Sequence, residues 1–187
     1  ELSAITWNLV EKRPGFEREE DPYFVRQCMH CTEAACVAVC PTRALQYDEL
    51  GFVGVDVELC NGCGYCTQFC PFGVPHLGDA NVVTGAGKTG KCTFCQEKTR
   101  AGDGGPSCAE ACPTGALTWG PRQDLVERAQ QRVSELRDEG RIGAQIYGLN
   151  ELGGLHRLSI LLDDPRAYGL PLKPEGTFDF SAVWQQA

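Results

Sequence analysis

The twelve cysteines of this 187-residue chain constrain its fold more than any other feature. They form three runs of four, each of which begins with C-x2-C and ends with C-x3-C-P. Cysteines this numerous and this regularly spaced either crosslink a chain through disulfides or bind metal. Disulfides fit poorly, because cysteines so close together leave mostly strained or short-loop pairings. The runs are Cys28, Cys31, Cys36 and Cys40; Cys60, Cys63, Cys66 and Cys70; and Cys92, Cys95, Cys108 and Cys112.

The spacing in the first two runs is typical of [4Fe–4S] ligands. In the bacterial two-cluster pattern, three cysteines of a run hold one cluster and the fourth ligates the other cluster. The second run matches this pattern in full, and the first has two extra residues between its second and third cysteines. We therefore predict two clusters with exchanged fourth ligands. Set A is Cys28, Cys31, Cys36 and Cys70, and set B is Cys60, Cys63, Cys66 and Cys40. Small residues within or beside the second run, Gly62, Gly64 and Gly73, should let backbone N–H groups approach the sulfurs.

The third run has twelve residues between its second and third cysteines, which makes its metal ambiguous. Two cysteine pairs with a spacer also describe a structural zinc site. The C-x3-C-P ending, which all three runs share, favours iron and predicts a third cluster on this run.

Charge and hydropathy exclude several functional classes. The formal net charge of −8 and the pI near 4.9 argue against a nucleic-acid partner, which requires a basic surface. No apolar run is long enough to span a membrane, and no signal-peptide pattern is present. No catalytic triad, paired carboxylate or metallohydrolase motif appears.

The remaining sequence predicts an α+β fold. We expect strands at 4–11, 116–120 and 157–162, and a hairpin over 44–58 that turns near Leu50 and Gly51. Pro121 is expected to occupy the first position of a helix that ends near Gly140, with Leu125, Val126, Ala129, Val133 and Leu136 on its apolar face. We divide the chain into a two-run lobe at 1–79, a third cluster-binding segment at 80–120, and a helix with an extension at 121–187.

Several other residues have structural interpretations. The charged segment 17–21 is expected to be a solvated loop, and the Gly-rich segment 81–90 a connector, since it matches only the tail of a P-loop motif. His30 and His76 lie close to cysteines and either tune a cluster or have a solvent-facing or capping role, whereas His156 is expected to be structural. The tryptophans at 7, 119 and 184 are expected in the core or at a partner interface.

The chain resembles the iron–sulfur (beta) subunit of respiratory formate dehydrogenases, among the iron–sulfur subunits that serve molybdopterin oxidoreductases. The segments CMHCTEAACVAVCPTRAL, CNGCGYCTQFCPFGVP and KCTFCQEKTRAGDGGPSCAEACPTGAL carry the general resemblance. The narrower one rests on DLVERAQQRVSELRDEG and IYGLNELGGLHRLSILLDDPRAYGLP. The resemblance implies tandem ferredoxin-like cluster domains with a C-terminal helix and strand extension.

The resemblance also bears on Cys112. The family usually carries a further N-terminal run that exchanges ligands with the third run, and this sequence has none. A complete chain would hold one cluster with Cys92, Cys95, Cys108 and Cys112. A truncated chain, which we expect, would hold set C with Cys92, Cys95 and Cys108, and Cys112 would ligate a fourth cluster.

The resemblance implies an electron-transfer role without substrate chemistry. The expected partner is a molybdenum- or tungsten-pterin catalytic subunit that oxidises formate, and the electron acceptor is either a membrane cytochrome or a soluble protein. The family's C-terminal transmembrane helix is missing, which predicts a soluble or peripheral complex, with periplasmic location through co-export favoured over the cytoplasm. The alternatives are an iron–sulfur subunit of another molybdopterin oxidoreductase, a free-standing polyferredoxin and, least favoured, a zinc-binding interaction module.

Overall fold

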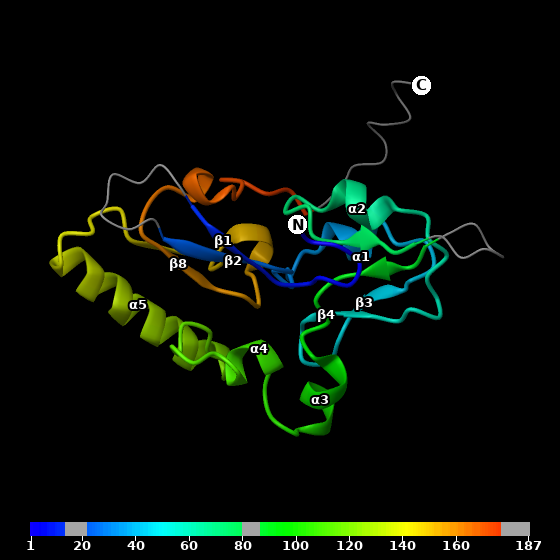
Figure 1. Cartoon of the computed structure of the whole chain (residues 1–187), viewed down its shortest axis with the longest axis horizontal. Helices are drawn as coiled ribbons and strands as arrows, with labels where there is room; N and C mark the ends of the chain where they lie inside the picture. Colours follow the sequence, from blue (N-terminus) through cyan, green and yellow to red (C-terminus); the bar gives the residue numbers. More distant parts are fainter. Residues whose placement is uncertain (14–21, 80–86, 177–187) are drawn as a thin grey trace.

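The structure is a computed structural model that describes residues 1–13, 22–79 and 87–176. Within these ranges the molecule is elongated, with short strands and helices gathered at its two ends (Figure 1). The elements of one end are α1 (Ala35–Ala38), β3 (Leu45–Tyr47), β4 (Val53–Val55), α2 (Tyr65–Phe69), β5 (His76–Leu77) and β6 (Thr89–Gly90). Those of the other end are β1 (Leu9–Lys12), β2 (Tyr23–Arg26), α5 (Arg122–Asp138), β7 (Gln145–Tyr147) and β8 (Ser159–Leu161). The short helices α3 (Gln96–Ala101) and α4 (Ser107–Glu110) belong to the third cysteine run.

The first two cysteine runs form similar units. Helix α1 lies within the first run and precedes β3, and helix α2 lies within the second run and precedes β5. The two helices pack against each other, and each following strand joins an antiparallel pair, β3 with β4 and β5 with β6. The mixed α+β character predicted from the sequence is therefore confirmed.

The predicted hairpin over 44–58 is also confirmed. Leu45 pairs with Val55, and Tyr47 pairs with Val53. The turn is closed by Asp48, whose backbone N–H donates to Phe52 O at 2.8 Å and whose Oδ1 accepts from Leu50 N–H at 2.9 Å. A local side-chain bond of this kind stabilises a tight turn.

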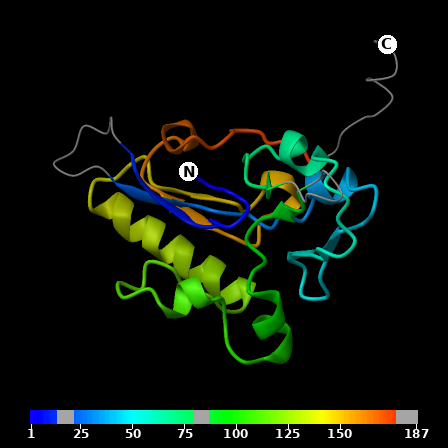
Figure 2. The same ribbon diagram turned by 45° about the vertical axis from the view of Figure 1, so that its right-hand side comes forward.

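The other end of the molecule is built from two hairpins and helix α5. Strands β1 and β2 pair antiparallel, as do β7 and β8, and α5 packs along β7 (Figure 2). The helix begins at Arg122, so Pro121 precedes it and does not occupy its first turn as predicted. It buries Ala129, Val133 and Leu136, and Arg137 donates to Ala144 O just beyond its C-terminal end. The predicted helix is otherwise confirmed.

Three strand predictions need correction. The strand predicted at 4–11 is β1 at Leu9–Lys12, and residues 4–8 are not extended into a ladder. The segment 116–120 forms no strand. It is a loop after the third run, and the N–H of Leu117 donates to the sulfur of Cys112 instead of to a neighbouring strand. The strand predicted as buried at 157–162 is β8, of which Leu161 is buried and Ile160 is exposed. Strands β2 and β7, which complete these pairs, were not predicted.

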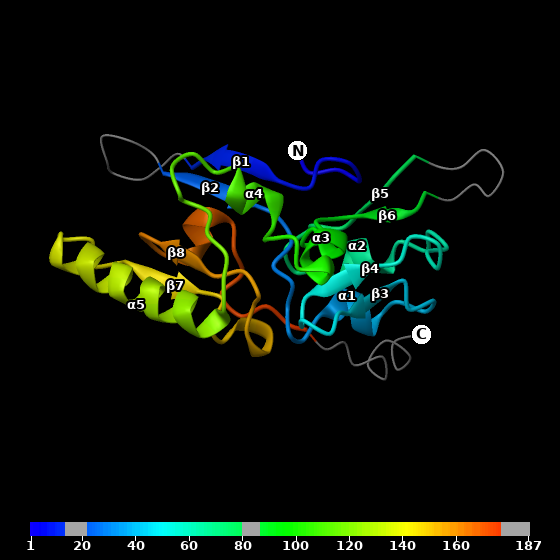
Figure 3. The ribbon, with the colours of Figure 1, turned by 90° about the horizontal axis from the view of Figure 1, so that it is seen from below.

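Two neighbouring core clusters connect the cysteines to the rest of the fold. The larger core joins Phe24, Met29, Phe72, Tyr147 and Leu155, and so includes residues from the first two runs and the C-terminal third of the chain. A smaller core packs Ala34, Leu45, Val53, Val55 and Cys66 between the first two runs. Figure 3 shows how the segment after β2 passes from one end of the molecule to the other. The half-buried Cys31 packs against both cores.

Among the described residues, none of the helices has the length and apolar character needed to cross a bilayer. The predicted loop at 17–21 and residues 81–86 of the Gly-rich segment lie outside the described ranges, as does Trp184.

Candidate metal centres

The thiols of set A gather in the structure although they come from two runs. Burial raises the pKa of the Cys31 thiol far above its usual value, and the thiolates of Cys28 and Cys70 raise it further. Burial also raises the pKa of Cys36, and repulsion from Cys28, Cys70 and Cys31 adds to it. Thiolates brought together in a buried region repel one another. A cationic metal centre that they bind in common would remove this repulsion.

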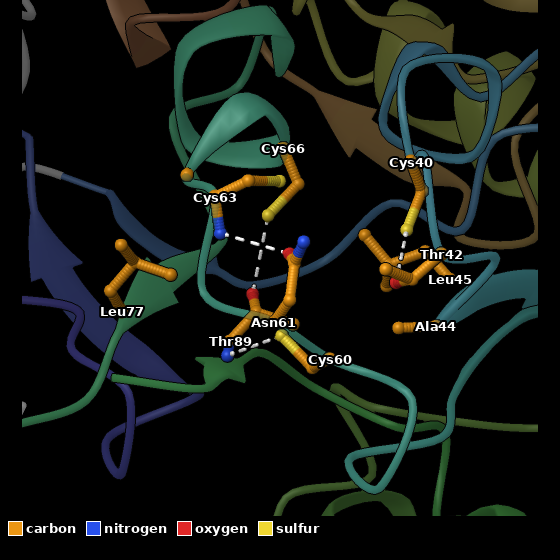
Figure 4. Close-up of a pocket in the computed structure, with 11 residues that line it drawn as sticks. Cys40, Thr42, Ala44, Leu45, Cys60, Asn61, Cys63, Cys66, Leu77 and Thr89 are labelled. Atoms are coloured by element: carbon orange, nitrogen blue, oxygen red, sulfur yellow. Dashed lines mark hydrogen bonds between the residues drawn. The ribbon is translucent and has the colours of Figure 1, made fainter. Parts of the chain in front are cut away.

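The thiols of set B gather in the same way. Burial raises the pKa of Cys66, the Thr89 hydroxyl opposes this, and repulsion from Cys60, Cys63 and Cys40 raises the pKa further. All four cysteines line one pocket (Figure 4). Cys66 is buried but Cys63 is exposed, so set B lies at the surface of the molecule.

Hydrogen-bond donors face the sulfurs of set B. The N–H of Thr89 donates to Cys60 Sγ at 3.4 Å, and its hydroxyl lies 3.4 Å from Cys66 Sγ. Burial would raise the pKa of Cys40, but backbone N–H groups of the following loop and the Thr42 hydroxyl lower it overall. Donors of this kind stabilise a thiolate and tune the potential of a cluster bound to it.

The third run approaches set A through Cys92. Burial raises the pKa of Cys92 to about 11, and repulsion from Cys28 and Cys108 contributes to the rise. The sulfur of Cys95 accepts from the N–H of Ser107, the residue before Cys108, at 3.4 Å. The cysteines of set C thus lie near one another, and Cys92 lies near Cys28 of set A.

Cys112 is set apart from the other cysteines of its run. Its sulfur accepts from Leu117 N–H at 3.4 Å and lies 3.5 Å from the Thr114 hydroxyl. These two groups lower its pKa to about 7. Within the described chain, the groups that hydrogen-bond the Cys112 sulfur come from its own loop.

The donor sets fit [4Fe–4S] clusters. In the described ranges, no three His, Cys, Asp or Glu side chains converge closely enough to hold a single metal ion. A [4Fe–4S] cube spreads four thiolates over four irons, so its ligands surround a cube and not one point. Sets A and B each provide four thiols, and N–H or hydroxyl donors accompany the sulfurs of set B and of Cys112.

The C-terminal third of the chain holds the first run in place. The segment 152–157 runs antiparallel to 29–33: Glu33 N–H donates to Leu152 O at 2.8 Å and Thr32 N–H to Gly154 O at 3.0 Å. Cys31 forms an isolated β-bridge with the fully buried Leu155. The sequence offered no signal for this pairing, because the two segments lie more than half a chain apart.

A buried lysine and a half-buried arginine near sets A and C were also missed by the sequence analysis. Lys91 is 1% exposed, and its Nζ donates to Val53 O at 2.7 Å and to Cys92 O at 2.9 Å. The guanidinium carbon of Arg157 lies 5.6 Å from the ring centroid of Phe24. Buried lysines and arginines are rare without a partner charge, so their burial here points to anionic neighbours.

His30 is buried and not solvent-facing. Burial lowers its pKa well below the usual value, and the charge of Lys91 lowers it further, so the ring is neutral. Its Nδ1 accepts from Val53 N–H at 3.2 Å, which places the proton on Nε2. No described protein atom accepts that proton.

The other residues singled out from the sequence have local partners. His76 Nδ1 lies 2.8 Å from Val74 O, and His156 Nδ1 lies 2.8 Å from His30 O, in keeping with the structural role predicted for His156. Trp7 and Trp119 are not in the core: both are exposed, and Trp7 donates to Ala4 O. Lys88 of the Gly-rich segment forms an exposed ion pair with Glu58 at 3.8 Å.

Comparison with known proteins agrees with this geometry. The model of the 4Fe–4S dicluster domain family matches residues 20–122, which contain all three cysteine runs. The chain is 34% identical over 182 residues to the iron–sulfur subunit of the nitrate-inducible formate dehydrogenase of Escherichia coli K12. That match covers 94% of this chain and 60% of the relative, so the chain spans about three fifths of the relative's length.

Two further relatives match a smaller part of the chain. The hydrogenase-2 operon protein HybA of Escherichia coli O157:H7 is 38% identical, over 71% of this chain and 43% of its own length. The NrfC homologue of Haemophilus influenzae is 40% identical, over 64% of this chain and 52% of its own length.

Proposed function

The chain belongs to the 4Fe–4S dicluster domain family, and we propose from this premise that it relays electrons for the catalytic subunit of a formate dehydrogenase. The observation that supports the proposal is that the closing cysteine of each of the first two runs lies near cysteines of the other run. Cys70 lies with Cys28, Cys31 and Cys36, and Cys40 lies with Cys60, Cys63 and Cys66. Two clusters held in this way would be close together and rigidly oriented, as electron hopping requires.

In this proposal the chain's own residues bind the clusters, shield them from water and tune their reduction potentials. Sets A, B and C would hold one [4Fe–4S] cluster each, and Cys112 would ligate a fourth. The bound clusters would each accept and release one electron. The core residues around set A exclude water, while the exposed Cys63 leaves set B accessible to a redox partner. Substrate bonds would be made and broken in a molybdenum- or tungsten-pterin partner.

The extent of similarity favours formate dehydrogenase over other oxidoreductases. The match to the formate dehydrogenase subunit covers 94% of the chain and therefore includes most of α5, β7 and β8, which lie beyond the dicluster domain. The matches to HybA and the NrfC homologue cover 71% and 64%. A subunit of a hydrogenase complex is the second candidate, because HybA is more identical to the chain where it does match.

The test is elemental and redox analysis of the native complex, purified without oxygen. We expect iron and acid-labile sulfide in quantities for several clusters, together with molybdenum or tungsten. Formate should bleach the visible absorption of the clusters, and hydrogen or nitrite should not change it. Zinc in place of iron would contradict cluster binding. Iron without a pterin metal would indicate a free-standing polyferredoxin, and reduction by hydrogen alone would select the second candidate.

A further inference from the structure

Sets A and B are surrounded by different kinds of groups, which bears on how easily each accepts an electron. The donors near set B are neutral: the N–H and hydroxyl of Thr89 and the hydroxyl of Thr42 contact its sulfurs. The groups near sets A and C include two cations, the buried Lys91 and the half-buried Arg157. Net charge, hydrogen bonds and exposure to solvent are the factors by which a protein sets a cluster's potential.

Lys91 lies at the junction of two parts of the site. One carbonyl that its Nζ contacts belongs to Val53, in strand β4 beside the first two runs. The other belongs to Cys92, the first cysteine of set C. Val53 packs in the same core as Cys31 and Cys36 of set A, so the Lys91 ammonium lies near both sets.

No described carboxylate pairs with Lys91, whose Nζ donates to the two carbonyl oxygens. Its charge is therefore not cancelled by an anionic side chain. In a buried place such a charge is weakly screened and acts strongly on anionic neighbours.

Arg157 approaches the same junction from the C-terminal segment that pairs with the first run. Its backbone N–H donates to Met29 O, next to Cys28, at 3.3 Å. Burial lowers the pKa of its guanidinium to about 10, while the thiolates of Cys92, Cys108 and Cys28 oppose this effect. Its Nη1 is buried and has no hydrogen-bond partner among the described atoms. An unsatisfied buried donor of this kind indicates a missing acceptor.

We propose that Lys91 and Arg157 are residues that set cluster potentials, placing two fixed positive charges at the junction of sets A and C and thereby raising the reduction potentials of the clusters held there. Among the described groups, those that contact the sulfurs of set B are neutral, so we expect its potential not to depend on either cation. An electron arriving at the A–C junction is stabilised by the two charges. This inference rests on the cluster assignment in the proposed function.

The test measures the potential of each cluster by redox titration followed by electron paramagnetic resonance, in the native complex purified without oxygen. Lys91→Met removes the charge and both hydrogen bonds, whereas Lys91→Gln removes the charge and keeps an N–H donor. Lys173→Met is the control, because it removes an exposed lysine. The signal of set B is identified as the one that changes in Cys63→Ser, since Cys63 is its exposed ligand.

We expect both Lys91 variants to shift two cluster potentials to more negative values and to leave that of set B unchanged. Lys173→Met should shift none. Unchanged potentials in both Lys91 variants, with all clusters present, would overturn the proposal, as would an equal shift in set B. A shift in Lys91→Met that is absent in Lys91→Gln would assign the effect to hydrogen bonding and also reject it.

Arg157 provides an independent test if the Lys91 variants fail to assemble. Arg157→Met should shift the same two potentials to more negative values, and Arg157→Lys, which keeps the charge, should restore them. Equal shifts in the two variants would reject a charge effect. If the unmodified complex has no clusters, the proposed function fails instead, and iron analysis before each titration separates the two failures.

Discussion

The thiol of Cys70, which closes the second cysteine run, lies beside that of Cys28, which opens the first. The packing of α1 on α2 brings the two runs together, as the proposed exchange of their closing cysteines requires. Backbone N–H groups of Val74, Phe72 and Gly73 point at Cys70 and offset part of the rise in pKa that its burial causes. If the second run contributes to two sites as proposed, the loss of its closing cysteine should appear in the first run's site.

This exchange predicts the effect of replacing a closing cysteine. Cys70→Ser should disturb the cluster of set A and leave that of Cys60, Cys63 and Cys66 intact, with a loss of up to about four irons. Cys40→Ser is the matched variant and should disturb set B alone. Iron analysis and electron paramagnetic resonance of the two variants provide the measurement. If Cys70→Ser instead removes the signal of set B, the runs do not exchange ligands.

Thr89→Val should lower the potential of the set B cluster. The substitution removes a hydroxyl 3.4 Å from Cys66 Sγ but keeps the backbone N–H that donates to Cys60. A hydrogen bond of this type contributes about 1 kcal/mol, so the fold should survive. A redox titration checks the shift. Thr67→Val serves as the control, since that hydroxyl donates to Gly64 O at 2.7 Å and not to a sulfur.

Gly90→Ala should destabilise the protein, because an added Cβ would lie 2.0 Å from the backbone oxygen of Ala4. Overpacking against backbone costs about 1–3 kcal/mol or more. Gly78→Ala is the control in the same ladder, where a Cβ would make ordinary contacts at 3.5 Å and beyond. The apparent melting temperature, followed by loss of cluster absorption, should fall for the first variant only. Equal melting temperatures would show that the two backbone segments are not in contact.

Asp48→Asn should cost stability that does not vary with pH between 5 and 8. Burial would raise the pKa of Asp48, but the N–H of Leu50 and the guanidinium of Arg100, 2.6 Å away, lower it overall. A carboxylate with a lowered folded-state pKa stabilises the fold above its unfolded pKa of about 4, and this contribution is lost only as the pH falls further.

Because Arg100 is partly exposed, the ion pair contributes at most about 1 kcal/mol. Denaturant unfolding of the loaded protein at pH 8, 6.5 and 5 should give a constant difference between Asp48→Asn and the unmodified protein. A difference that disappears by pH 6 would show that another group controls this part of the fold.

Leu155→Ala should destabilise the protein by about 2–5 kcal/mol, the usual cost of deleting a fully buried leucine side chain. Because Leu155 bridges Cys31, cluster loss should accelerate as well. Leu172→Ala changes an exposed residue and should alter stability by less than about 0.5 kcal/mol. Denaturant unfolding and the rate of cluster bleaching measure the two effects. Unchanged bleaching in Leu155→Ala would show that the C-terminal segment does not protect set A.

Local features of this chain were predictable because their physical cause lies within a few residues. The spacing of the cysteines indicates how a short loop can wrap a cluster, and the exchange of Cys40 and Cys70 as ligands stays a prediction from that spacing. The hairpin closed by Asp48 and the apolar face of α5 follow from turn chemistry and helical periodicity. Neither depends on distant parts of the chain.

Only the tertiary structure decided the features that depend on distant segments. Strands β2 and β7 are three or four residues long, and their pairing is fixed by partners and not by their own pattern. From the sequence alone, Lys91 and Arg157 would be expected at the surface, where most lysines and arginines lie. They are buried because the third run and the C-terminal segment fold against the first run. The sequence by itself determined which metal centres the chain can hold, whereas the tertiary structure decided which charges surround them, because burial and electrostatic proximity are properties of packing.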